Sequence, residues 1–62
     1  MCESTVILKK GSKREVVMKD VIQVLVKGED IEVIGILGDS KNLRGSIAKI
    51  DLSGHEIIIE GR

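Results

Sequence analysis

The sequence predicts an all-β fold, a small barrel of about six short strands in one domain spanning residues 1–62. Its apolar content is almost wholly Val, Ile and Leu, and the β-branched residues occur in short runs separated by polar, mostly Gly-containing breaks. No window of eleven residues combines the apolar spacing of an amphipathic helix with a capped start. The length of 62 residues allows one hydrophobic core and leaves no room for a second.

The expected strands follow one another at intervals of about ten residues, which is the spacing typical of small all-β domains. The runs are Cys2–Lys9, Glu15–Met18, Val21–Lys27, Ile31–Leu37, Ser46–Asp51 and Glu56–Glu60. The breaks between them are Lys10–Arg14, Lys19–Asp20, Gly28–Asp30, Gly38–Arg44 and Leu52–His55.

Two of the breaks have the composition of tight hairpin turns. The first is Lys27–Asp30. The second is Leu52–His55, in which we expect Gly54 to adopt a positive φ, since glycine enters that region without steric cost. Gly35 falls inside an expected strand and predicts a bend there. The polar segment Gly38–Asn42 is the longest of its kind, so we expect a mobile loop.

Composition excludes most nucleic-acid binders. Ten Lys and Arg balance ten Asp and Glu, and the chain has no aromatic residue on which a base could stack. A basic cluster of Lys9, Lys10, Lys13 and Arg14 surrounds the first turn, where a solvated hairpin tip is the simpler interpretation. An RNA-binding barrel is kept as the alternative function, although we do not expect a nucleic-acid partner.

The sequence also indicates where the protein resides and that it is not an enzyme. It shows no secretory leader and no apolar run near 18 residues, and a lone thiol fits a reducing compartment, so we expect a cytoplasmic protein without a membrane partner. With one Cys, one His and no Tyr, the chain offers no oriented nucleophile and base, and a core of this size leaves little volume for a substrate pocket.

A folded monomer would be only marginally stable. Mass scaling predicts that folding buries about 5,900 Å², which supplies roughly 90 kcal/mol if about 60% of it is apolar, and ordering the residues costs roughly the same. Small domains in this position usually gain stability from a disulfide, a metal or a partner subunit. Cys2 is the only cysteine, so no disulfide can form within the chain.

Cys2 is the chemically distinctive residue, because its position places three donors in sequence. The Met1 amine, the Cys2 amide nitrogen and the Cys2 sulfur close two adjacent five-membered chelate rings, which favours a flat arrangement typical of Ni(II) or Cu(II). If Met1 is removed, Cys2 itself offers an amine and a thiolate. One chain lacks four good donors, whereas two chains related by a two-fold axis supply them. The residues alone leave open a second interpretation, that Cys2 is a small buried hydrophobe.

Two further residues have the side chains of metal ligands, and we assign neither to the site. His55 lies in a polar turn and is expected to be solvated. Met18 lies among apolar residues and is expected to pack in the core.

The chain resembles the CooT family of small nickel-binding proteins along nearly its full length. The resemblance rests on Met1-Cys2 followed by the Val-rich segment to Leu8, and on Asp20-Val21-Ile22-Gln23-Val24 after the first turn. It continues through the charged hairpin that leads to Ile31-Glu32-Val33 and through the segment Gly45–Leu52 before the last strand.

This resemblance implies a compact SH3-like β-barrel that forms a homodimer. It also implies one Ni(2+) ion at the dimer interface, held by Cys2 of both chains, and it leaves open whether the nitrogen donor comes from Met1 or from Cys2 itself. The implied role is a metallochaperone or nickel-storage protein, associated with the maturation of nickel-dependent carbon monoxide dehydrogenase as the client enzyme.

Overall fold

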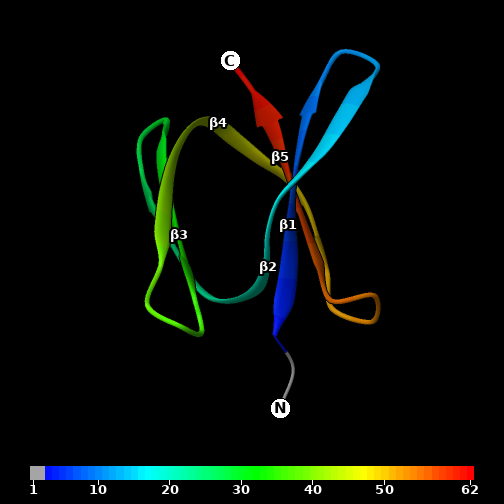
Figure 1. The fold of residues 1–62 in the computed structure, drawn as a ribbon. Helices are drawn as coiled ribbons and strands as arrows, with labels where there is room; N and C mark the ends of the chain where they lie inside the picture. The colour runs from blue at the N-terminus through cyan, green and yellow to red at the C-terminus, as the bar shows by residue number, and fades with distance from the viewer. Residues whose placement is uncertain (1–2) are drawn as a thin grey trace.

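The computed structural model describes residues 3–62, which form five β-strands in a single sheet (Figure 1). The strands are β1 (Ser4–Lys10), β2 (Lys13–Lys27), β3 (Asp30–Gly35), β4 (Ser40–Asp51) and β5 (Glu56–Gly61). The expectation of an all-β chain is therefore confirmed. No helix in this part of the chain is long and apolar enough to cross a membrane.

The sheet closes on itself, with the strands paired in chain order and β5 returning to β1, so that it forms a barrel. Neighbouring strands are antiparallel except β1 and β5, which run parallel from Thr5 opposite Glu56 to Lys9 opposite Glu60. Because the first and last strands run in the same direction, β1 begins at one end of the barrel and β5 finishes at the other (Figure 1).

The structure has five strands instead of the expected six, because the runs Glu15–Met18 and Val21–Lys27 belong to one continuous strand, β2. The polar pair Lys19 and Asp20 lies within this strand. Asp20 adopts a φ of 56°, and the register of β2 shifts on either side of it, so the chain bends without leaving the sheet. The first part of β2 pairs with β1 and the second part with β3.

The bend that we expected at Gly35 is therefore at Asp20, and Gly35 instead ends β3. A Cβ at Gly35 would lie 2.5 Å from an Asp39 carboxylate oxygen and 3.0 Å from the Met18 sulfur, so close packing accounts for the glycine. The polar segment Gly38–Asn42 is also not a simple loop. Its residues from Ser40 onward begin β4 and pair with β3.

Both predicted hairpin turns are present, between β2 and β3 and between β4 and β5. In the second turn it is His55, with a φ of 55°, that adopts the left-handed conformation, and not Gly54. An Asp51 side-chain oxygen accepts hydrogen bonds of 2.9 Å from the Ser53 hydroxyl and from the Gly54 backbone N–H. These bonds hold the turn around the carboxylate, and the positive φ falls on the residue after Gly54.

The core lies inside the barrel and is built from branched aliphatic side chains of β1, β2, β3 and β5. The largest fully buried side chains are Val6, Ile31, Val33 and Ile59. Met18 packs among them at 8% exposure, which confirms its predicted place in the core.

Candidate functional site

The two predicted metal ligands, Met1 and Cys2, lie outside the described residues, which begin at Glu3. The structure does place the chain directly after them. Ser4 begins β1 and pairs with Val21, just beyond the bend of β2. The Thr5 backbone N–H donates a 2.8 Å hydrogen bond to the carbonyl oxygen of His55 in the β4–β5 turn. The start of β1 is thus fixed on both sides at one end of the barrel.

Two turns and the bend of β2 meet at this end, which we call the N-terminal end of the barrel (Figure 1). The β3–β4 turn is joined to the β2 bend, because the Ile36 N–H donates a 2.9 Å hydrogen bond to the Asp20 carbonyl. The β4–β5 turn is joined to β1 through the bond between Thr5 and His55. Segments far apart in sequence therefore surround the start of β1.

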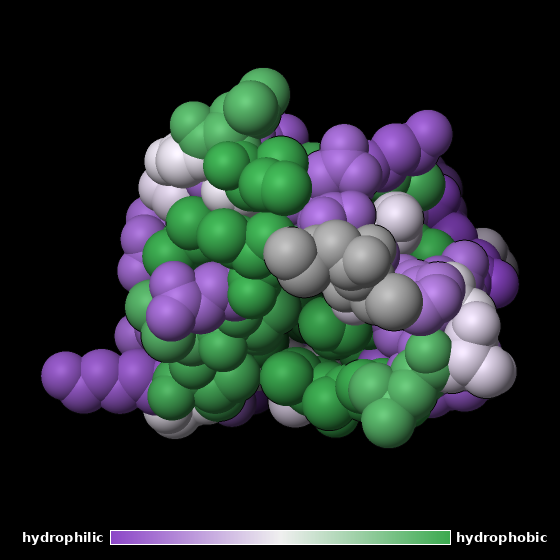
Figure 2. Space-filling view, turned by 90° about the horizontal axis from the view of Figure 1, so that it is seen from below, coloured by the Kyte–Doolittle hydropathy of each residue, from purple (hydrophilic) through white to green (hydrophobic). Residues whose placement is uncertain are grey.

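Large apolar side chains are exposed on these connections. Leu37 is 90% exposed and Leu52 is 81% exposed, each at a turn, while Ile22 and Ile36 are exposed by 58% and 50%. Figure 2, which views the molecule from below, shows extensive hydrophobic surface at this end of the barrel. Exposed apolar surface of this kind marks interaction sites in soluble proteins.

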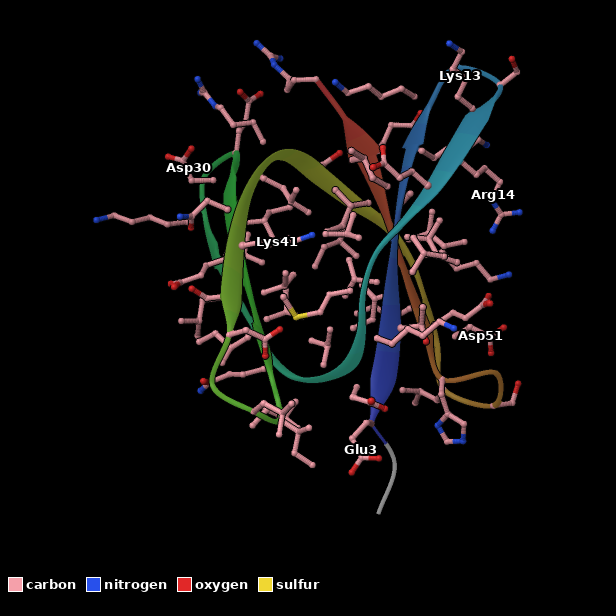
Figure 3. All side chains as sticks on the ribbon, in the orientation of Figure 1. Glu3, Lys13, Arg14, Asp30, Lys41 and Asp51 are labelled. Carbon is pink, nitrogen blue, oxygen red and sulfur yellow. The ribbon has the colours of Figure 1, made fainter. Side chains whose placement is uncertain are left out.

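Acidic residues share the N-terminal end with this apolar surface. They are Glu3, Asp20, Asp39, Asp51 and Glu56, of which Glu3 and Asp51 are labelled in Figure 3. The nearest basic residues along the strands are Lys19, Lys41 and Lys49, and Lys49 lies 4.0 Å from an Asp51 oxygen. An excess of carboxylates makes the local potential negative and raises the local concentration of cations. The end that carries the start of β1 is therefore suited to attract a metal ion.

Hydrogen bonds keep one of these carboxylates ionised. The Gly54 N–H and then the Ser53 hydroxyl hold the pKa of Asp51 below its usual value of 3.8, and Lys49 adds a smaller effect in the same direction. Donors that bind the charged form of a carboxylate favour that form. Asp51 thus contributes a fixed negative charge to this end of the barrel.

Within residues 3–62 there is no cluster of three or more His, Cys, Asp or Glu that could hold a metal ion.

A groove of about 320 Å³ lies between the start of β1 and the second part of β2. Its lining residues are Glu3, Ser4, Val21, Ile22, Gln23, Val24 and Ile57. The pairing of β1 with β2 ends at Ser4 and Val21, so the part of β2 that lines the groove has no β1 partner. It is the described cavity that lies closest to Cys2 in the chain.

Sequence reasoning did not identify the surroundings of this site. The prediction that His55 is a solvated turn residue holds for its side chain, which is exposed. The backbone carbonyl of His55, however, accepts the hydrogen bond that anchors β1. The carboxylates are scattered along the sequence, and only the closure of the barrel brings them to one end. No local sequence pattern predicts that grouping, because it depends on strand pairing between distant segments.

The basic cluster of the first turn lies at the other end of the barrel. Lys9 is directly opposite Arg14, and Lys10 is directly opposite Lys13, across the β1–β2 hairpin. It is separate from the site at the start of β1.

Comparisons with known proteins agree with the fold and identify the family. A crystal structure of a protein assigned to CooT from Carboxydothermus hydrogenoformans superimposes with a TM-score of 0.88, covers 98% of each chain and is 24% identical, so this match concerns the fold. An uncharacterised protein of Archaeoglobus fulgidus is 46% identical over 71% of this chain and 98% of its own length. One of Methanocaldococcus jannaschii is 47% identical over 76% of this chain and 82% of its own length.

The model of the family described as CO dehydrogenase accessory protein CooT matches residues 1–60, which include Met1 and Cys2. The match covers nearly all of the chain, and the family it describes is one of accessory proteins and not of catalysts. On this basis the chain belongs to the CooT family of CO dehydrogenase accessory proteins.

Proposed function

We propose that this protein binds nickel for the maturation of CO dehydrogenase, as a metallochaperone or storage protein of the cytoplasm. In this proposal a homodimer of SH3-like barrels shares one Ni(II) ion through the Cys2 thiolates of both chains. The observation that carries it is the placement of β1, which begins two residues after Cys2 at an acidic end of the barrel. Family membership supplies the client enzyme class.

The donor chemistry at the start of the chain suits nickel. Two thiolates, together with nitrogen from Met1 or from Cys2, form a planar set of sulfur and nitrogen ligands, the geometry that Ni(II) adopts with such donors. Thiol and amine must lose protons before they coordinate, so binding releases protons. The carboxylates Glu3 and Asp51 supply negative charge that favours arrival of the cation without taking part in the ligand set.

The dimer follows from the ligand count and from the small core. One chain provides too few strong donors, while a two-fold axis doubles them. Contact between two copies also buries apolar surface, which the barrel alone leaves exposed at Ile22, Leu37 and Leu52. A nickel ion shared between the subunits would therefore link them and would itself be the metal that the protein carries.

Calorimetric titration with Ni(II) tests the proposal. The wild-type chain should bind one metal per two chains, and Cys2→Ser should abolish that binding, while His55→Ala, which removes the chain's only imidazole, should leave the stoichiometry unchanged. The complex should show the visible absorption of a planar diamagnetic centre. Unchanged binding by Cys2→Ser, or a purely octahedral spectrum, would overturn the proposal.

One observation favours the alternative function, RNA binding. The like-charge pairs Lys9–Arg14 and Lys10–Lys13 face each other across the hairpin, and none of these four residues forms an ion pair within residues 3–62. Retention on single-stranded RNA that falls steeply with salt, survives Cys2→Ser and is lost in Lys13→Glu would establish this function. Absence of retention at low salt would dismiss it.

A further inference from the structure

The basic cluster of the first turn is not neutralised by the rest of the described chain. Lys9 lies directly opposite Arg14, and Lys10 lies directly opposite Lys13, across the β1–β2 hairpin. None of the four residues forms an ion pair within residues 3–62. Like charges directly opposite each other destabilise a sheet, so this arrangement has a cost that the stability of the barrel does not explain.

Other basic residues at the same end of the barrel do have acidic partners. Arg44 lies 3.8 Å from a Glu29 oxygen and 3.4 Å from an Asp30 oxygen. Arg62 lies 3.0 Å from the second Glu29 oxygen. The positive charge that remains available to a partner is therefore concentrated on the β1–β2 hairpin, far from Glu3 (Figure 3).

An apolar row crosses the outer face of the sheet, which is the face turned away from the core. Val6 is fully buried in the core, and a strand points successive side chains to opposite faces, so Ile7 points outward. Ile7 lies opposite Val16 of β2 and opposite Ile58 of β5, and side chains of opposite residues share a face. Val16 is 52% exposed, so the β2 end of this row is open to solvent.

Two cations of the basic cluster lie beside the apolar row. Lys9 follows Ile7 by two residues and Arg14 precedes Val16 by two, which places both cations on the outer face. The apolar side chains and the positive charges are thus about 7 Å apart along the strands. This surface is complementary to a segment in which an apolar side chain is followed by carboxylates.

The other two cations line a small cavity on the opposite face of the hairpin. The cavity has a volume of about 120 Å³ and is bounded by Leu8, Lys10, Lys13 and Glu15. A Cβ at Gly61 would lie 2.7 Å from the Lys10 Cγ, so the glycine leaves room for the Lys10 side chain against β5. Two ammonium groups face one carboxylate there, which gives a second position for an anionic group beside an apolar side chain.

We propose that the β1–β2 hairpin is a docking site for an acidic segment of another protein. Carboxylates of that segment pair with the basic cluster, and an apolar side chain packs on Ile7 and Val16. Binding offsets the like-charge repulsion within the hairpin. The inference does not rest on the proposed nickel site, because the hairpin lies at the other end of the barrel from the start of β1 (Figure 1).

The surface of the hairpin fits a protein better than a nucleic acid. A phosphate backbone is anionic throughout, whereas the carboxylates of Glu15 and Glu60 lie among the cations, Glu60 directly opposite Lys9. Proteins that bind single strands stack the bases on aromatic side chains, and this chain has none. Apolar side chains beside the cations match a segment that mixes acidic with apolar residues.

A peptide titration followed by NMR tests the docking site in the full chain. The probe is Glu-Ser-Glu-Ser-Leu-Ser-Glu-Ser-Glu, which in an extended form places its Leu and Glu side chains on one face. It should shift the amide signals of residues 7–16 and leave those of the N-terminal end unchanged. Replacing its Leu by Ser should weaken binding about tenfold, and replacing every Glu by Gln should abolish it. Absence of shifts in the hairpin, or equal binding of the version without Leu, would overturn the inference.

The double variant Lys13→Glu, Arg14→Glu separates docking from stability. Each substitution turns a like-charge pair across the hairpin into an opposite-charge pair. The melting temperature should therefore rise while binding of the peptide is lost. The matched control, Lys19→Glu with Lys49→Glu, changes the net charge equally at the other end of the barrel and should weaken binding less than about threefold, because distant charges are screened. Binding that persists in the first variant, or equal loss in both, would contradict the proposed site.

Two further measurements identify the kind of partner. An oligouridine of the same charge as the peptide should bind more weakly than the peptide, and tighter binding by the RNA would establish the alternative function in place of this one. Light scattering should give the same mass for wild type and for the double variant. A lower mass of the variant would show that the hairpin contacts another copy of the chain, which would also overturn the inference.

These outcomes are separable from those of the nickel proposal. Cys2→Ser should bind the peptide as wild type does. If the peptide binds while wild type fails to bind nickel, the docking site stands and the proposed function falls. If nickel binds through Cys2 but the peptide does not bind, the function stands and the docking site is wrong.

Discussion

The backbone N–H of Thr5 lies 2.8 Å from the carbonyl oxygen of His55 and donates a hydrogen bond to it. This bond joins the chain three residues after Cys2 to the turn between the last two strands. It continues the parallel pairing of β1 and β5 as far as the N-terminal end of the barrel. The position of the start of β1 is therefore governed by the closure of the whole sheet.

Nickel affinity should rise with pH, because the Cys2 thiol and the nitrogen donors must lose protons to coordinate the metal. A free thiol has a pKa of about 8.5, so it is mostly protonated at neutral pH. Calorimetry at several pH values, each in two buffers of different ionisation enthalpy, should show tighter binding at higher pH and release of protons. Affinity that stays constant across neutral pH would contradict thiolate and amine coordination.

Removing the bond between Lys41 and Val17 should destabilise the barrel slightly. Lys41 reaches from β4 toward β2, and its Nζ lies 3.1 Å from the Val17 carbonyl oxygen (Figure 3). We expect Lys41→Met to lower the free energy of unfolding by about 1 kcal/mol, the usual net value of such a bond. Urea denaturation measures the change.

The matched control for this variant is Lys13→Met in the first hairpin, where the lysine has no ion-pair partner within residues 3–62. Equal effects of the two substitutions would show that the bond to Val17 contributes nothing.

Gly45→Ala should be among the most damaging substitutions in the chain. Gly45 has a φ of 159°, and a Cβ there would collide with the backbone carbonyl of Glu60 on the paired strand. Because backbone atoms cannot move aside without breaking the ladder, we expect a loss of more than about 2 kcal/mol. Thermal denaturation followed by circular dichroism measures it.

Gly28→Ala provides the comparison. Gly28 has a φ of 62°, but a Cβ there would meet no atom within 4 Å. Only the left-handed conformation is then penalised, at about 1 kcal/mol. If Gly28→Ala were the more damaging of the two, steric contact with Glu60 would not be the reason for Gly45.

Asp51 should make the stability of the β4–β5 turn depend on pH. The Gly54 N–H and the Ser53 hydroxyl lower its pKa in the folded state below the value of 3.8 that applies in the unfolded chain. The ionised carboxylate therefore contributes stability above pH 3.8, and this contribution is lost as the pH falls through the lowered pKa.

In Asp51→Asn this contribution is absent at every pH, so its melting temperature should fall less steeply in acid than that of wild type. Thermal melts over a pH series on either side of the unfolded-state value measure the slopes. Parallel curves for the two proteins would show that Asp51 has no part in the acid sensitivity.

Much of the fold could be predicted from local pattern. The β-branched runs identify strands, and Gly28 and the Leu52–His55 segment identify two hairpin turns, because turn composition is a short-range property. The long strand β2 was divided into two in the prediction, since Lys19 and Asp20 look like a break. A polar bulge and a turn have the same composition, and only the pairing with β1 and β3 distinguishes them.

The candidate site was only partly predictable. Cys2 stands out because the donors are consecutive in the chain. The carboxylates of Asp20, Asp39 and Glu56 could not be grouped in advance. They come from the bend of β2, the β3–β4 turn and the start of β5, which meet only when the barrel closes. The pairing of β2 with β1 likewise ends at Val21 and Ser4, and no composition signal marks that point.

The parallel pairing of β1 with β5 has a practical consequence for anyone handling this protein. The start and finish of the described chain lie at opposite ends of the barrel, so an affinity tag or a surface tether attached after Arg62 is far from the start of β1. A tag placed before Met1 would replace the free amine with an amide and remove a proposed donor. Purification through the carboxyl terminus is thus the design that keeps metal measurements meaningful.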